Sequence, residues 1–130
     1  TLTIWRDLME GQRVVHLDVK PPAGPPSKLG HSIGWFEDGD LIIETSNFTA
    51  DAWGGHTGID SSAQKHLIER FSMTDDGLGI DLTITLTDPV YLSQPVTFTH
   101  KWIKTADREL VQTPCTKESA QLWIEAGFNE

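Results

Sequence analysis

Residues 66–87 read HLIERFSMTDDGLGIDLTITLT, in which apolar and polar side chains alternate on either side of an acidic turn. A period of two is typical of strands that bury one face. Asp75-Asp76-Gly77 closes a predicted hairpin between His66–Met73 and Leu78–Thr87. A two- or four-residue loop puts the following side chains on one face: Leu67, Glu69, Phe71, Met73, Leu78, Ile80, Leu82, Ile84 and Leu86. This predicted inner face is apolar except for Glu69.

Three further hairpins are predicted from similar alternation. The clearest has Asp38-Gly39 at its tip, because both residues tolerate the positive φ of a type I′ turn. In that register Trp35 faces Ile42, and Ile33 faces Glu44. The three hairpins pair Thr1–Trp5 with Arg13–Val19, His31–Phe36 with Asp40–Ser46, and Val96–Lys104 with Glu109–Pro114.

A chain of about eight strands joined mainly by hairpins closes into a barrel or curves strongly. Thr116 is expected to cap one helix through Ala120, Trp123 and Ile124. We therefore predict an all-β fold over residues 1–130, which are enough for a single domain. The predicted architecture is an antiparallel up-and-down, lipocalin-like barrel or a strongly curved sheet of about eight strands, with one C-terminal helix.

The charge and the cysteine count exclude several classes of function. Lys and Arg number 10 against 19 Asp and Glu, giving a net charge of −9. Such a surface repels phosphate backbones and anionic lipid, so no nucleic-acid partner is expected. No apolar run approaches the roughly 20 residues of a membrane-spanning helix. One cysteine cannot form a Cys-based zinc knuckle, and the five histidines lack close metal-ligand spacing, so no metal or cofactor is predicted.

Glu69, His100 and His66 are the candidate catalytic residues. Glu69 and His100 fall by parity on apolar faces, and His66 begins the strand that contains Glu69. A carboxylate in apolar surroundings has a raised pKa unless a cation or hydrogen bonds compensate, and it can then exchange protons with a histidine. The alternative is structural: Glu69 pairs with Arg13, Arg70 or a lysine at the barrel rim, and His100 is a satisfied core histidine.

A second set of residues is predicted to bind a ligand. Trp35, Phe71, Phe98 and Trp102 are the candidate walls of a cavity, since a barrel of about eight strands has room for one small molecule. Trp53, in a Gly- and Asp-rich loop, is the candidate lid. His31 and Glu44 form a diagonal cross-strand pair that would add polar contacts. The alternative is that the aromatic residues simply fill a core.

Residues 30–45 read GHSIGWFEDGDLIIET, and residues 66–71 read HLIERF. With Asp88-Pro89 and Pro95, they resemble a family of uncharacterised, often exported bacterial proteins with the pattern GxSxGxWEGDxLxx(D/E)T followed by HxxERF. The insertion of Phe36 shifts the hairpin tip by one residue from that pattern. The family has no established activity, and its members usually continue upstream of the position of Thr1. The resemblance therefore implies kinship, favours a periplasmic or secreted location, and assigns no catalytic residue.

Three hypotheses on function follow. The leading one is a module that binds a small apolar or amphipathic molecule in its cavity. The second is a cofactor-independent isomerase, lyase or hydrolase that uses Glu69 with His66 or His100. The third is an accessory or oligomer-forming domain that pairs through an exposed hairpin face, because both faces of the Asp38-Gly39 hairpin carry apolar residues. The GxSxG motif around Ser32 matches a hydrolase nucleophile elbow, but its strand context argues against that role.

Overall fold

The computed structural model describes residues 1–5, 12–52, 60–105, 116–118 and 121, and within them the chain forms seven strands of one sheet. The strands are β1 (Leu2–Trp5), β2 (Gln12–Leu17), β3 (His31–Glu37), β4 (Asp40–Ser46), β5 (His66–Met73), β6 (Gly79–Thr87) and β7 (Val96–Ile103). Their order in the sheet follows the chain. All neighbours are antiparallel except β2 and β3, which pair in parallel after a proline-rich connection.

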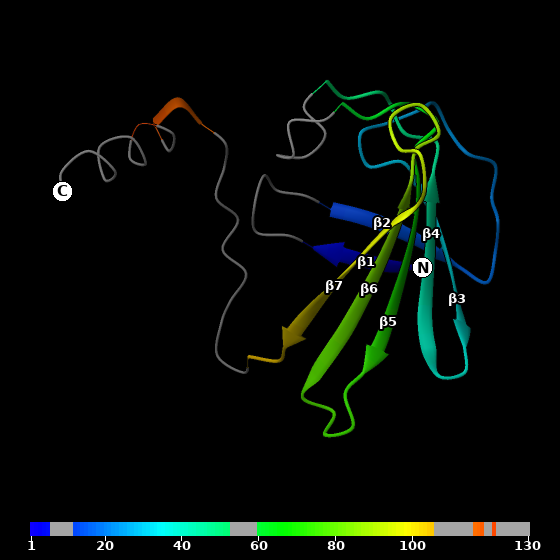
Figure 1. Cartoon of the computed structure of the whole chain (residues 1–130). Helices are drawn as coiled ribbons and strands as arrows, with labels where there is room; N and C mark the ends of the chain where they lie inside the picture. Colours follow the sequence, from blue (N-terminus) through cyan, green and yellow to red (C-terminus); the bar gives the residue numbers. More distant parts are fainter. Residues whose placement is uncertain (6–11, 53–59, 106–115, 119–120, 122–130) are drawn as a thin grey trace.

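The sheet curls strongly, so that β1 and β2 run across the layer formed by β3 to β7 (Figure 1). Leu2 and Ile4 of β1 consequently pack against the same buried cluster as Ile80 and Ile84 of β6. Among the described strands β1 and β7 are the two edges, and no pairing joins them. The described architecture is therefore a half-barrel.

This architecture confirms the predicted all-β, strongly curved sheet. The prediction of antiparallel neighbours is wrong for β2 and β3, because the long connector lets β3 start at the same end as β2. The predicted strand Glu109–Pro114 lies outside the described residues, as does most of the predicted C-terminal helix, of which only Lys117, Glu118 and Gln121 are described and helical. No helix of the described residues is long and apolar enough to cross a membrane.

The hairpin registers place side chains on the faces that the alternation predicts. At the β3–β4 turn Asp38 and Gly39 have φ of 52° and 90°, and Trp35 pairs with Ile42 as expected. Glu69 pairs with Ile84, which in turn pairs with Phe98. Strand parity is thus a reliable guide to the concave and convex faces of this sheet.

The core lies on the concave face, where the β1–β2 hairpin covers β4 to β6. Val15, Ile43, Phe71 and Leu82 are its buried members. Full burial of each such side chain contributes roughly 1.5–3 kcal/mol. Gly34 makes this packing possible, since an added Cβ would lie 2.9 Å from a Val15 methyl carbon. The missing side chain lets β2 fold closely over β3.

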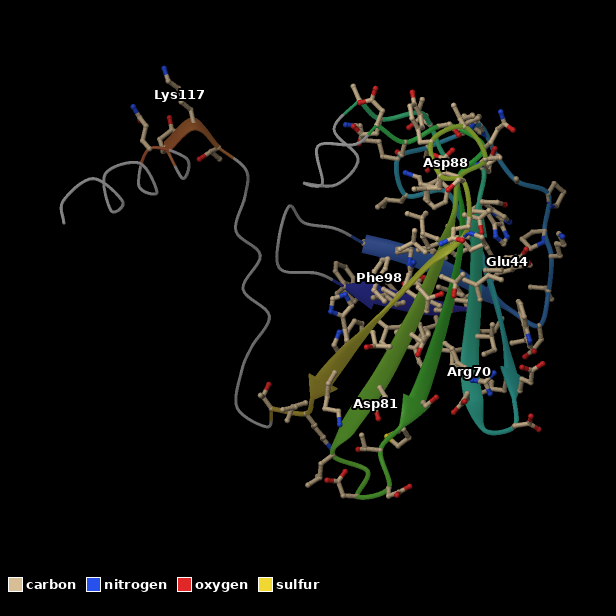
Figure 2. The ribbon with its side chains drawn as sticks, in the orientation of Figure 1. Glu44, Arg70, Asp81, Asp88, Phe98 and Lys117 are labelled. Atoms are coloured by element: carbon tan, nitrogen blue, oxygen red, sulfur yellow. The ribbon has the colours of Figure 1, made fainter. Side chains whose placement is uncertain are left out.

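At the end of the sheet opposite the β3–β4 and β5–β6 turns, the buried carboxylate of Asp88 joins two loops. Asp88 accepts hydrogen bonds from the backbone N–H and the hydroxyl of Ser62, both at 2.7 Å. Burial raises the pKa of Asp88, but these bonds and the N–H groups of Val90 and Tyr91 outweigh it and hold the pKa below its usual range. Figure 2 shows Asp88 at the end of the molecule opposite Asp81. Asp88 therefore ties the β4–β5 and β6–β7 connections together.

Candidate functional site

The concave face holds an apolar cavity of about 300 Å³. Six strands (β1 and β3 to β7) and the β3–β4 turn contribute to its wall. The lining residues are Leu2, Ile4, Phe36, Gly39, Leu41, Phe71, Met73, Ile80 and Trp102. None of them is charged, and the indole N–H of Trp102 is the only polar side-chain group among them. The cavity can therefore hold an apolar group and offers it almost no competing hydrogen bonds.

The cavity is deep at one end and open at the other. Phe71 is 8% exposed and packs edge-on against Trp102, with 5.6 Å between ring centroids. Phe36 and Met73, at the end formed by the β3–β4 and β5–β6 turns, are 64% and 66% exposed. Leu2, Ile4 and Leu17 of the β1–β2 hairpin pack against the buried cluster that contains Ile43. An extended ligand could enter here without any strand moving.

A second hollow of about 380 Å³ adjoins the first and shares Met73, Ile80 and Trp102 with it. Its other lining residues are Gly77, Leu78, Gly79, Ile103 and Lys104. The two hollows therefore form one largely apolar groove around Trp102, the concave groove.

Beside the cavity, Glu69 forms an ion pair that spans the fold. Arg13 donates from Nη1 to Glu69 Oε2 at 2.5 Å and from Nη2 to Oε1 at 3.2 Å. The Arg13 and Glu69 side chains are only 10% and 5% exposed. The Nε of Arg13 is also buried and has no hydrogen-bond partner in the described part of the chain. Glu69 therefore has the structural role that was the alternative to catalysis, an ion pair with Arg13. This pair lies in the interior of the fold rather than at its rim.

The other two candidate catalytic residues do not meet Glu69. His66 lies on the convex face, where its Nε2 is 2.7 Å from Glu44 Oε1, so the expected pairing of His66 with Glu69 is wrong. His100 shares the concave face with Glu69 but is exposed, and its ring contacts Phe98 edge-on at 5.8 Å. No hydrogen bond between described residues joins His100 to Glu69. The geometry brings together no acid–base pair from this set.

The predicted ligand residues divide between the two faces. Phe71 and Trp102 line the concave groove, and Phe98 lies on the same face at 41% exposure. Trp35 lies on the convex face, where it borders a separate shallow hollow of about 210 Å³, so it is not a wall of the groove. Trp53 lies outside the described residues.

His31 and Glu44 also lie on the convex face, and each has another partner. The ring of His31 stacks on that of His16 with 5.2 Å between centroids, whereas Glu44 binds His66. The expected His31–Glu44 contact is therefore absent from the described interactions. No group of three or more His, Cys, Asp or Glu within the described ranges is placed to hold a metal ion.

Several groove residues were not among the candidates. Leu2 and Ile4 could not be assigned to this site, because only the fold-over of β1 brings them to β5 and β6. Phe36 and Met73, by contrast, share strand parity with Leu41 and Phe71, and that signal was sufficient to find them. Ser32 lies within β3, buried and 2.8 Å from the hydroxyl of Thr45, which does not fit a nucleophile elbow.

Comparisons with protein-family models, with curated proteins and with solved structures find no match.

Proposed function

We propose that this protein binds a small apolar or amphipathic molecule in the concave groove. The observation that carries the proposal is the lining of the cavity: eight apolar side chains and one glycine surround about 300 Å³ without a charged group. Small-molecule sites commonly have volumes of roughly 300–1,000 Å³ and predominantly apolar walls. Removing apolar groups of both partners from water supplies the driving force.

The exposure of the groove residues supports the same proposal. Phe36, Met73 and Ile103 are each more than 60% exposed, and they border one continuous apolar surface. Exposed apolar patches of a few hundred Å² on a soluble domain are often interaction sites. A ligand that covers this surface gains roughly 25 cal/mol for each Å² of apolar area removed from water.

The test is titration with N-phenyl-1-naphthylamine, a neutral apolar dye that becomes fluorescent in apolar surroundings. We expect saturable binding with a stoichiometry of one dye per chain, accompanied by energy transfer from tryptophan to the dye. This energy transfer should be reduced in a Trp102→Phe variant. Met73→Lys places a charge in the groove at an exposed position and is expected to weaken dye binding. Ile68→Lys is the matched control, because Ile68 is 40% exposed on the convex face.

Equal dye affinity in Met73→Lys, Ile68→Lys and the parent protein would contradict the proposal. Circular dichroism of each variant separates loss of binding from loss of folding. Absence of saturable binding by the folded parent protein would also reject it.

A further inference from the structure

The open end of the concave groove is bordered by an excess of negative charge. Gly39 of the β3–β4 turn lines the first hollow, and Gly77 of the β5–β6 turn lines the second. Both turns lie at the same end of the sheet (Figure 1). They carry the acidic residues Glu37, Asp38, Asp40, Asp75 and Asp76.

Ion pairs neutralise only part of this charge. Arg70 binds Asp40 at 2.6 Å and Glu37 at 3.2 Å, and the bond from Arg70 lowers the pKa of Asp40. On the neighbouring strands Lys101 lies 3.3 Å from Asp81, the residue labelled at the turn end of β6 in Figure 2.

Three carboxylates of the two turns remain without an ion-pair contact in the described part of the chain: Asp38, Asp75 and Asp76. Asp76 accepts hydrogen bonds from Thr74 and from the N–H of Leu78, which lower its pKa and keep it ionised. Lys104, which lines the second hollow, opposes them, and the charge of Lys101 also lowers the pKa of Asp76. The mouth of the groove therefore has a net negative charge at neutral pH.

Aromatic rings are exposed at the same mouth. Phe36 immediately precedes the acidic β3–β4 turn, and Trp102 lies between the two hollows with 45% of its surface exposed. Faces of aromatic rings attract cations, and tryptophan does so most strongly. The apolar concave groove, the exposed aromatic rings and the unpaired carboxylates are together complementary to one class of molecule.

We propose that the ligand of the concave groove is a cationic amphiphile, an apolar chain that ends in an amine or a quaternary ammonium group. This inference rests on the proposed function and specifies its ligand class. The chain lies along Phe71, Ile80 and Trp102, and the cation lies at the mouth near Asp38 and Asp75. The net charge of −9 favours approach of a cation in the same sense.

The charge distribution disfavours the other occupants of such a groove. A fatty-acid anion would meet three carboxylates and one lysine at the mouth. A second copy of the chain, packed mouth to mouth, would bring the two acidic turns against their own copies, and like charges placed together oppose association.

The experiment measures displacement of N-phenyl-1-naphthylamine by three ligands with the same ten-carbon chain: decylammonium, 1-decanol and decanoate. At low ionic strength we expect decylammonium to bind about 5-fold more tightly than decanol, and decanoate more weakly than decanol, since one exposed ion pair contributes a factor of about 1.4 to 5. The difference should shrink at about 0.5 M salt, because the screening length falls below the roughly 8 Å of physiological buffer.

Asp75→Lys reverses one charge at the mouth, on an exposed turn residue. It should weaken decylammonium binding and strengthen decanoate binding by a few fold, each measured relative to decanol. Asp60→Lys is the matched control, since Asp60 is exposed in the segment that leads to Ser62 at the opposite end. It should change neither ratio.

The outcomes separate the two proposals. Failure of the dye to bind rejects the groove as a binding site. Dye binding with equal affinities for the three ligands, or tighter binding of decanoate that is lost in Lys104→Gln, overturns the cationic class alone. A dimer in sedimentation that dissociates when dye is added identifies a second copy as the occupant and also overturns it.

Discussion

The buried ion pair between Arg13 and Glu69 gives the sharpest test of how this fold is held together. The two residues are 56 positions apart and join the β1–β2 hairpin to β5. Replacing Glu69 with leucine leaves the Arg13 guanidinium buried without a counter-charge. Breaking a buried pair in this way costs about 3–5 kcal/mol. A domain of this size has a free energy of unfolding on the order of 5–15 kcal/mol, so the variant should lose a large fraction of it.

A double variant distinguishes the cost of the unpaired charge from the contribution of the pair. Arg13→Met with Glu69→Leu replaces both partners by apolar side chains in an apolar interior. Such replacements are commonly neutral or stabilising by about 1–4 kcal/mol, because the desolvation of two charges is avoided. The double variant should therefore recover most of the stability lost by Glu69→Leu.

Urea unfolding followed by circular dichroism measures all three free energies, provided that the transitions share one slope. Asp81→Asn is the control, since the Asp81–Lys101 pair is more than half exposed on both sides and should contribute below about 1 kcal/mol. If Glu69→Leu also costs less than about 1 kcal/mol, the Arg13–Glu69 pair is effectively solvated and the reasoning is refuted. A double variant as unstable as the single one would mean that the charges themselves position the hairpin.

Three further predictions concern the packing of the sheet. Asp88→Ala should lower the free energy of unfolding by about 3 kcal/mol, because bonds from Ser62 to a buried carboxylate are lost. Since the folded pKa of Asp88 is depressed, its contribution is present above the unfolded pKa near 3.9 and is lost as the pH falls through the folded pKa, so acid titration should destabilise the parent protein more than the variant. Gly34→Ala should cost about 1–3 kcal/mol in thermal or urea unfolding, because its Cβ would lie 2.9 Å from a β2 side chain. Ser32→Val should cost about 1–3 kcal/mol by leaving the Thr45 hydroxyl buried without its partner, and a neutral result would show that this hydroxyl finds another acceptor.

Local alternation was sufficient to predict the faces of the sheet. The registers of β3 with β4 and of β5 with β6 follow from the short turns that join them, and a turn of fixed length sets which residues face each other. Glu69 was placed correctly on the concave face for that reason. The convex position of His66 follows from the same parity, since His66 is three positions, an odd number, before Glu69.

Local sequence patterns do not predict the contacts between segments that are distant in the chain. The parallel pairing of β2 with β3 depends on the path of residues 18–30, and a proline-rich connector of that length permits either direction. The choice of Arg13 rather than Arg70 as the partner of Glu69 depends on that path as well, because only the fold-over of the β1–β2 hairpin brings Arg13 to β5. Leu2 and Ile4 line the cavity for the same reason, because the fold-over of the hairpin brings β1 to β5 and β6.

The fold-over also explains why the groove exists. β1 and β2 run across the layer that contains β5 and β6, so these two strands cover only part of its concave face (Figure 1). Val15 of β2 and Ile43 of β4 are fully buried where the hairpin packs, and toward the turns Met73 is left 66% exposed. These two strands anchor the curl through the Arg13–Glu69 pair and leave the concave groove beside that anchor, so the stability of the fold and the opening of the groove depend on the same two strands.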